Sequence, residues 1–360
     1  MIVAAALSKG SIVEPGGARL RPVSFADLPG FAADDHLAAF VVFQRSGRAI
    51  VAGAPELRAA LPAPEALRAV CAAALRETIS TGAQARRFFE THFTPCAIDT
   101  GEQPPAFLTG YYEPVVLGAL ERSAGFTEPV FARPADLDHL SPYPDRAAIE
   151  AMGPAHFQPL VWLADAIEVF MIHVQGSAAV DLPDGRRMRL TYAGRNGLPY
   201  TSIGRALIEA GEIAQDEMSL ARLKQWVRDQ GQTAGQPGRA LLHRNRSFIF
   251  FALDESPARA TGPIGGAGVP LTPLRSVAMD RGLWPYGLPV FVDALLPSKD
   301  GALAPFQRLM VGQDTGSAIL GPARLDLFMG SGDAAGAMAG NIRHRSGLYI
   351  LLPRSEGLSP

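Results

Sequence analysis

From Phe107 onward the chain is a series of short apolar runs broken by Gly and Pro. The strongest of these runs, 248–253, 289–295 and 347–352, are rich in β-branched and aromatic residues. Such runs predict β-strands, because branched and aromatic side chains pack well on a pleated surface. Many short strands separated by turns favour a β-barrel over a doubly wound parallel sheet.

Further strands and helices are predicted in the middle of the chain. The runs 107–117, 167–175 and 188–192 are predicted strands, and the turn 183–185 precedes the last of them. The segments 203–210 and 217–228 are predicted helices, and the Gly- and Gln-rich stretch 231–238 is a predicted loop.

The first third of the chain is predicted to be helical after a short irregular start. Apolar residues recur at helical spacing over 64–75, and 83–93 continues that style with Phe88, Phe89 and Phe93 as candidate core residues. Pro95 is predicted to close the helical run, because proline lacks the backbone N–H that a helix interior uses.

The composition is that of a globular protein with balanced charge. Of the 360 residues, 48% are hydrophobic and 19% are charged, which suits a chain with a sizeable core and room for two domains. The 33 Lys and Arg against 35 Asp and Glu give a net charge of −2. No general attraction to nucleic acid or to an anionic membrane is therefore expected, and the partner should be neutral or of mixed charge.

Neither a membrane-spanning helix nor an intact signal peptide is expected from the sequence. No apolar run reaches the ~20 residues that a spanning helix needs. The start, 1–9, has a short apolar stretch without a preceding basic residue, whereas a secretory signal needs a basic region and a longer apolar core. The chain is expected either to be cytoplasmic or to lack a signal that was removed or left out.

Neither a metal site nor a cofactor is predicted. Cys71 and Cys96 are the only cysteines, and no nearby histidines complete a zinc cluster. They are either two buried thiols or one disulfide in an oxidising compartment, where loop closure contributes about 3 kcal/mol. The glycine-rich stretch 262–268 lacks the Lys-Ser/Thr and the following helix of a phosphate loop. His173, inside an apolar run, is predicted to be a core histidine.

Two aspartates, Asp314 and Asp326, lie in the segment 311–330, each beside apolar residues and glycine. Burial among apolar groups raises the pKa of a carboxyl, and an aspartic acid that keeps its proton near neutral pH acts as a general acid. The alternative for Asp326 is a turn or cap aspartate before a strand. Asp314 either supports Asp326 or holds its own Asp-Thr-Gly turn together.

Polar and aromatic residues at predicted strand ends are the other candidates for ligand binding. Tyr111, Tyr112 and Glu113 precede a proline, and one of the two tyrosines is expected in the core because strand neighbours face opposite sides. Gln175 and Ser177 end an apolar run and would cap it or meet a ligand.

Three further features allow more than one interpretation. Gly176 permits a close backbone approach. Tyr192 and Asn196 flank a glycine turn and could serve that turn alone. The cluster 186–189 either meets acidic groups of a ligand or, more simply, forms a solvated strand face.

An ordered set of motifs resembles the MltA family, the membrane-bound lytic transglycosylases A that cleave peptidoglycan. The resemblance covers roughly residues 105–352. The motifs that carry it are Thr-Gly-Tyr-Tyr at 109–112, Val-Gln-Gly-Ser at 174–177, Tyr-Ala-Gly-Arg-Asn-Gly at 192–197 with Ser-Ile-Gly at 202–204, Val-Pro-Leu-Thr at 269–272, Arg-Ser-Val-Ala at 275–278, the run 314–330 and Ala-Gly at 335–336.

The resemblance implies a mainly β fold: a double-psi β-barrel, an inserted second β-rich domain, and a glycan groove between the two. The barrel would comprise 1–115 together with 250–360, and the inserted domain 116–249. The C-terminal part resembles a module named for three aspartates, here Asp293, Asp314 and Asp326. Of these, the resemblance makes Asp326 the catalytic acid and Asp314 its support, whereas Asp293, inside an apolar run, is expected to be structural.

The resemblance also implies the substrate and the reaction. The substrate-binding residues would be Thr109, Tyr111, Tyr112, Glu113, Gln175, Gly176, Ser177, Tyr192, Asn196 and Gly316. One aspartate would cleave the β-1,4 bond between N-acetylmuramic acid and N-acetylglucosamine without water, leaving a 1,6-anhydro ring. The partner would be peptidoglycan glycan strands, at a periplasmic or outer-membrane location. Family members are often lipid-anchored through an N-terminal cysteine, and this chain has none before Cys71.

Two other functions remain open at this stage. An aspartic protease would use the turn 314–317, but that chemistry needs two such turns sharing a proton. Asp326 lacks the Asp-Thr-Gly pattern, although a second such triplet occurs at 99–101. A non-catalytic glycan-binding barrel differs from the enzyme only in Asp326 and its surroundings.

Overall fold

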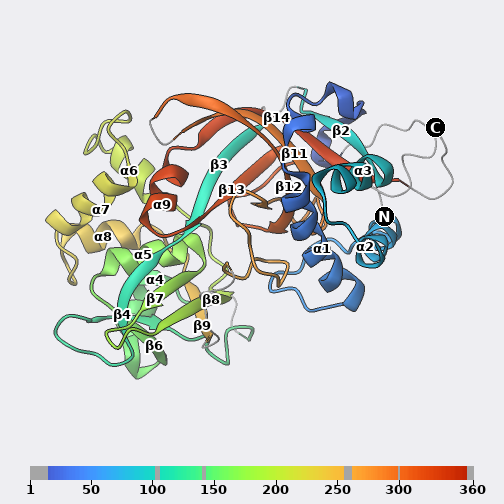
Figure 1. Ribbon diagram of the computed structural model, residues 1–360. Helices are drawn as coiled ribbons and strands as arrows, with labels where there is room; N and C mark the ends of the chain where they lie inside the picture. The colour runs from blue at the N-terminus through green and yellow to red at the C-terminus, as the bar shows by residue number, and fades with distance from the viewer. Residues whose placement is uncertain (1–14, 102–105, 140–142, 255–261, 299–300, 355–360) are drawn as a thin grey trace. The chain divides into compact units, whose positions relative to one another are not determined.

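The computed structural model describes residues 15–101, 106–139, 143–254, 262–298 and 301–354 (Figure 1). The chain forms two compact units. The first unit comprises Met1–Tyr111, Ile264–Gly330 and Asn341–Pro360, and the second unit comprises Tyr112–Pro263 and Ser331–Gly340. Each unit combines one β-sheet with helices, so the fold is α/β with two separate sheets.

A closed ring of strands forms the centre of the first unit. Its sheet has the order β1-β2-β14-β11-β12-β10-β13-β3, and β3 pairs with β14, which closes six of the strands into a barrel. Closure leaves those strands no open edge. The bounds are β1 Arg19–Pro22, β2 Phe93–Asp99, β3 Phe107–Glu113, β10 Ser276–Ala278, β11 Pro289–Pro297, β12 Leu303–Asp314, β13 Arg324–Ser331 and β14 Arg343–Pro353.

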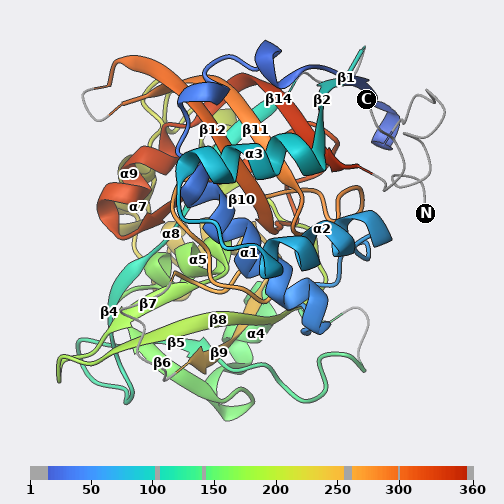
Figure 2. The same cartoon turned by 45° about the vertical axis from the view of Figure 1, so that its right-hand side comes forward.

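Three helices, α1 (His36–Ala52), α2 (Glu65–Arg76) and α3 (Gly82–His92), cover strands of this barrel (Figure 2). Phe40 and Phe43 of α1 pack against Phe88 and Phe89 of α3 in edge-on or tilted pairs, with ring centroids 5.0–6.3 Å apart. Such aromatic pairs add to the burial of apolar area. The predicted core role of the phenylalanines is confirmed, since Phe88, Phe89 and Phe93 are all buried.

The helical run ends before Pro95, not at it. His92 is the last residue of α3, Phe93 is already extended, and Pro95 lies inside β2 opposite Leu351. The other short elements are the 3₁₀ turns η2 Pro15–Gly17, η3 Phe25–Asp27, η4 Phe31–Ala33 and, in the second unit, η5 Gly153–Ala155.

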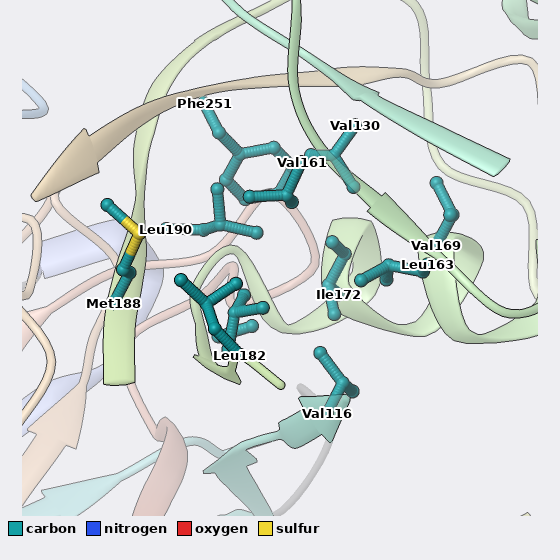
Figure 3. Close-up of a cluster of buried hydrophobic side chains, with 12 residues drawn as sticks. Val116, Val130, Val161, Leu163, Val169, Ile172, Leu182, Met188, Leu190 and Phe251 are labelled. Carbon is teal, nitrogen blue, oxygen red and sulfur yellow. The ribbon is translucent and has the colours of Figure 1, made fainter. Parts of the chain in front are cut away.

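The second unit has its own sheet, with the strand order β5-β6-β4-β7-β8-β9. Its elements are β4 Val115–Ala119, β5 Glu128–Phe131, β6 Pro159–Leu163, β7 Ala178–Asp181, β8 Arg187–Arg195, β9 Ile249–Asp254, α4 Arg146–Met152, α5 Ala166–Gln175, α6 Ile203–Glu209, α7 Leu220–Asp229, α8 Pro237–His243 and α9 Asp333–Gly340. Figure 3 shows the cluster of aliphatic side chains, including Val169 and Ile172 of α5, that packs with sheet residues such as Val161 and Leu190.

The strand predicted over 167–175 is wrong, because this segment is helix α5. Asp165 caps its N-terminus by accepting from the Glu168 amide, and Gly176 ends it in the left-handed conformation at φ 79°. One face of α5 packs on the sheet cluster, and another, with Phe170, packs among α6, α7 and α8. A helix buried on several sides is apolar all round and shows no helical period in its sequence.

The strand predicted over 107–117 is divided in two. Pro114 separates β3 from β4, and the two strands belong to different sheets. The turn at 183–185 is confirmed, with Gly185 at φ 84° between β7 and β8. Helix α6 agrees with its prediction, whereas α7 begins at Leu220.

Both cysteines are free and buried. Burial raises the pKa of the Cys71 thiol to about 12 and that of Cys96 to about 11, so both are unreactive thiols at neutral pH. Among the described residues, the helices fall short of the length and apolar character needed to cross a bilayer.

Candidate active site

Asp326 is the third residue of β13, opposite Ala278 of β10. Its neighbours Leu325, Leu327 and Phe328 are all buried. The alternative of a turn aspartate before a strand is therefore wrong, because Asp326 lies inside the strand. Its Oδ1 accepts a 2.5 Å hydrogen bond from the hydroxyl of Thr109 on β3, the next strand of the barrel.

The surroundings of Asp326 shift its pKa toward neutrality. Burial is the largest cause, and it raises the pKa from 3.8 to about 6. The Thr109 hydrogen bond and the Arg324 charge act in the opposite direction, while the Asp314 charge adds to the increase. A carboxyl group with this pKa holds or releases a proton near neutral pH, which is what a general acid requires.

Asp314 is the last residue of β12, and three donors fix its carboxylate. Oδ1 accepts from the amides of Gly266 and Thr315, each at 2.8 Å, and Oδ2 accepts from the Tyr111 hydroxyl at 2.8 Å. Burial, followed by the Asp314 charge, raises the pKa of Tyr111 well above its usual value, so the phenol stays a donor. Asp314 holds its own turn through the Thr315 amide, and its hydrogen bond with Tyr111 links it to strand β3.

A buried glutamine fastens the end of β12 to helix α1. Gln313 donates to the Ser46 hydroxyl at 2.7 Å and accepts from the Ser276 hydroxyl at 2.5 Å. The neighbouring Asp314 therefore projects from a strand end whose position is fixed by side-chain hydrogen bonds.

Sequence reasoning missed Gly266 and Arg58. The Arg58 amide donates to the Gly266 carbonyl at 3.1 Å, and its guanidinium donates to the Thr315 carbonyl at 2.7 Å. Arg58 thus connects both residues whose amides bind Asp314. A Cβ at Gly266 would come within 2.4 Å of the Tyr286 hydroxyl oxygen, which explains the glycine of the dismissed 262–268 stretch. Nothing local in the sequence identifies Arg58.

Gly316 and Asp293 have local contacts in the first unit. The Gly316 carbonyl accepts from the Ile319 amide at 3.0 Å in the turn after Asp314. Asp293 on β11 accepts from Gln307 at 2.9 Å, directly across the ladder on β12. This contact supports the structural interpretation of Asp293.

Several of the predicted binding residues lie in the second unit. Gln175, the last residue of α5, accepts from the Tyr112 amide at 3.2 Å through its side-chain oxygen. The Tyr112 ring packs so closely on Gly336 that a Cβ there would meet it at 2.8 Å. Tyr112 is 5% exposed and is therefore the core member of the tyrosine pair. Ser177 follows the Gly176 cap and precedes β7.

Glu113 forms a buried ion pair with Arg189. The Arg189 Nε donates to Oε1 at 2.7 Å, and the Ser331 hydroxyl donates to Oε2 at 2.6 Å. The prediction of a solvated face for 186–189 is therefore wrong for Arg189, which is 4% exposed. Arg186 and Arg187 pair with nearby aspartates at more exposed positions.

Asn196 has a structural role. Its amide donates to the carbonyls of Pro144 and Arg246, and its oxygen accepts from the Phe248 amide. Tyr192 lies on β8 opposite Phe251. These contacts favour the turn and ladder interpretation of this motif.

His173 is a core histidine, as predicted, although it lies on a helix. Its Nδ1 contacts the Arg146 guanidinium at 3.1 Å, and its ring centroid lies 4.3 Å from that of Phe248. Its Nε2 has no hydrogen-bond partner among the described residues. Burial, reinforced by the Arg146 charge, lowers the pKa of His173 well below its usual value, so the ring is neutral.

Two family models match the chain. The MltA specific insert domain matches residues 107–252, and the 3D domain matches residues 275–352. The membrane-bound lytic murein transglycosylase A of Escherichia coli K12 is 34% identical over 248 residues, and that of Vibrio cholerae is 34% identical over 251. The chain spans 64% of the length of each of these curated relatives, and the matched regions make up 68% of this chain.

Solved structures match over nearly the whole chain. A membrane-bound lytic murein transglycosylase from Agrobacterium tumefaciens is 35% identical with a TM-score of 0.80, and the match covers 93% of this chain and 98% of that one. MltA from Neisseria gonorrhoeae is 30% identical with a TM-score of 0.77, covering 98% and 96%. E. coli MltA with bound chitohexaose is 25% identical with a TM-score of 0.69, covering 93% and 95%. The chain belongs to the MltA family, and the MltA specific insert domain precedes the 3D domain along it.

Proposed function

We propose that this chain is a lytic murein transglycosylase that uses Asp326 as its acid and base. It would cleave the β-1,4 bond between N-acetylmuramic acid and N-acetylglucosamine and leave a 1,6-anhydro-muramic end. The observation that carries the proposal is the position of Asp326: inside a barrel strand, buried, and with a pKa raised to about 6. Such a group serves as donor and acceptor of one proton in the same cycle.

The first step would be protonation of the glycosidic oxygen. The Thr109 hydroxyl engages Oδ1 of Asp326, so we assign the transferable proton to Oδ2. As the bond between C1 and the glycosidic oxygen breaks, the N-acetylglucosamine leaves as an alcohol and positive charge develops on the muramic ring. Asp326 is then a carboxylate.

The second step would be attack of the muramic C6 hydroxyl on C1 of the same ring. Asp326 takes the hydroxyl proton, the C6 oxygen bonds to C1, and the enzyme returns to its protonated form without consuming water. The nucleophile is already tethered to the reacting ring, so bringing it into position costs little entropy. A second catalytic carboxylate, which ordinary glycosidases use, is therefore not required.

Asp314 would support the reaction from a fixed position. Its oxygens accept from Gly266, Thr315 and Tyr111, whereas Asp326 accepts from Thr109. Its negative charge favours the protonated form of Asp326. The two carboxyl groups thus have separate sets of donors, which does not favour the shared proton of an aspartic protease.

The ligand we propose is the glycan strand of peptidoglycan, supported by the E. coli relative with bound chitohexaose. The names of the relatives describe membrane-bound proteins, and we infer that this chain also acts beside a membrane, in the periplasm or at the outer membrane. Of the binding residues expected from the sequence, Thr109 donates to Asp326 and Tyr111 donates to Asp314, so both would position the carboxyl groups.

The test is mass spectrometry of purified sacculi incubated with the protein. The native chain should release anhydro-muropeptides, Asp326→Asn almost none, and Asp293→Asn, the matched control, close to the native amount. Equal yields from the native chain and Asp326→Asn would disprove the assignment of the acid. Retention of glycan polymer without turnover by the native chain would support the non-catalytic glycan-binding barrel, and release of peptide amines would support the protease.

A further inference from the structure

Arg324 lies two residues before Asp326 on β13, so strand alternation places both side chains on the same face. Its Nη2 donates to the Thr109 hydroxyl oxygen at 2.8 Å, and its Nη1 donates to the Leu325 carbonyl at 2.5 Å. The guanidinium carbon lies 5.4 Å from the centroid of the Phe107 ring. These contacts hold the guanidinium beside Thr109.

The direction of the Thr109 hydrogen bond follows from the chemistry of its partners. A guanidinium only donates, so the lone pair of Thr109 that faces Arg324 is an acceptor. A hydroxyl has one hydrogen, and that hydrogen remains for the 2.5 Å contact with Oδ1 of Asp326. Arg324, Thr109 and Asp326 therefore form a chain of donors that ends on the carboxyl group.

We propose that Arg324 is a positioning residue for the acid, because it holds the Thr109 hydroxyl as a donor to Oδ1 and so leaves the mobile proton on Oδ2. The inference rests on the proposed function of Asp326 and extends it to a residue on the opposite side of Thr109. An arginine in direct contact with the carboxylate would favour the ionised form strongly. Contact through a neutral hydroxyl orients the group with a weaker effect on its charge.

Charged and titratable groups reach Asp326 from three strands. Arg324 lies on its own strand β13, Asp314 comes from β12, and Tyr111 comes from β3. Arg324 lowers the pKa of Asp326 by its charge, and Thr109 lowers it by its hydrogen bond. Loss of Arg324 should thus raise the pKa through charge and through hydroxyl orientation, and the experiment has to separate the two.

The experiment is a titration of the Asp326 side-chain carboxyl by ¹³C NMR in the full-length chain, with the signal assigned by its loss in Asp326→Asn. We expect Arg324→Met to raise the pKa by about one pH unit, and Thr109→Val to raise it by a similar amount. The double variant should raise it by less than the sum of the two single changes, because Thr109→Val already removes the part of the Arg324 effect that passes through the hydroxyl and leaves only its charge. Arg324→Lys keeps the charge without the planar fork and should raise it by about half a pH unit.

Two outcomes would overturn the proposal. One is an unchanged pKa in Arg324→Met. The other is full additivity of Arg324→Met and Thr109→Val together with a native pKa in Arg324→Lys, which would mean a through-space charge effect alone. Thermal unfolding of Arg324→Lys confirms that the variant read in the titration is folded.

A pH profile of anhydro-muropeptide release gives a second readout. In Arg324→Met the alkaline limb should move to higher pH by the same interval as the carboxyl pKa. The titration does not depend on turnover. If Asp326→Asn retained native activity, the proposed function would fail while the titration still decided the role of Arg324.

Discussion

Asp326 and Glu113 are both acidic side chains buried in this protein, and their partners differ in one respect. Glu113 receives a guanidinium directly, from Arg189 at 2.7 Å, together with the Ser331 hydroxyl. Asp326 receives the Thr109 hydroxyl, and the Arg324 guanidinium donates to this hydroxyl instead of to the carboxyl group in that bond. Burial is therefore common to both groups, and the placement of the arginine distinguishes them.

Arg189 binds the Glu113 carboxylate directly, whereas a hydroxyl lies between Arg324 and the Asp326 carboxyl group. The first arrangement is an ion pair, and the second leaves a carboxyl group that can act as an acid. A buried carboxylate that contacts an arginine is a structural anchor, and removing either partner is costly. A buried carboxyl whose arginine is held one group away keeps a pKa near neutrality, about 6 for Asp326.

The largest effect should come from removing the acid. Asp326→Asn keeps the shape of the side chain but cannot donate a carboxylic proton, so release of anhydro-muropeptides should fall on the order of 10⁴-fold. Its unfolding midpoint should stay at or above that of the native chain, because no buried carboxylate remains. Initial rates on sacculi and urea titrations measure the two quantities, and a loss of rate with a matching loss of folding would contradict the assignment.

Removal of the buried ion pair should give the next largest effect, on stability. Glu113→Gln breaks the buried ion pair with Arg189 and should lower the free energy of unfolding by about 4 kcal/mol. The double variant with Arg189→Met should lose less than the sum of the two single changes. Glu209→Gln, which breaks the exposed Arg205 pair on α6, is the control and should lose at most about 0.5 kcal/mol.

The raised pKa of Asp326 should make stability depend on pH. The folded state binds the proton more tightly than the unfolded state, so the free energy of unfolding should fall as pH rises from 3.8 to about 6. The interval corresponds to about 3 kcal/mol, and Asp326→Asn should lose this part of the dependence. The protonated fraction of Asp326 passes through one half at about pH 6, so rates should decline above that pH. Denaturant unfolding of the two chains between pH 4 and 7 checks the difference, and parallel curves would contradict it.

Much of the fold follows from local sequence signals. The strands β9, β11 and β14 are apolar runs between turns, and α2 and α3 show helical spacing, so these elements were predicted. The failure at α5 has a physical cause, because a helix buried on several sides has no polar face. The Asp165 cap and the Gly176 end were the signals that could have identified it.

The candidate site was predictable in its aspartates and less so in their partners. Asp314 and Asp326 stand in a motif, and apolar neighbours indicated a raised pKa for Asp326. Arg58 and Gly266 come from loops far away in sequence from Asp314, and only the folded chain brings their backbone groups to it. Arg189, the partner of Glu113, was likewise predicted to lie on a solvated strand face. The sequence alone does not show which face of the sheet a strand residue points to, because that depends on how the strand pairs with its neighbours.

Asp314 is the intermediate case between the two carboxylates of the comparison, and it gives the smallest predicted effect. The amides of Gly266 and Thr315 and the Tyr111 phenol donate to Asp314. Arg58 in turn donates to the backbone carbonyls of Gly266 and Thr315. Arg58→Ala should loosen the turn, lower the rate about tenfold and reduce the free energy of unfolding by about 1–2 kcal/mol. The pH at which the rate declines should stay within about 0.3 units of the native value, because Asp326 keeps Thr109 and Arg324.

Arg48→Ala, which removes an exposed arginine that bonds Gln44 within α1, is the control and should match the native chain. Initial rates across pH decide the prediction: a native rate in Arg58→Ala would show that the two amides hold Asp314 without the Arg58 side chain, and a displaced pH profile would show that Arg58 acts on Asp326 instead.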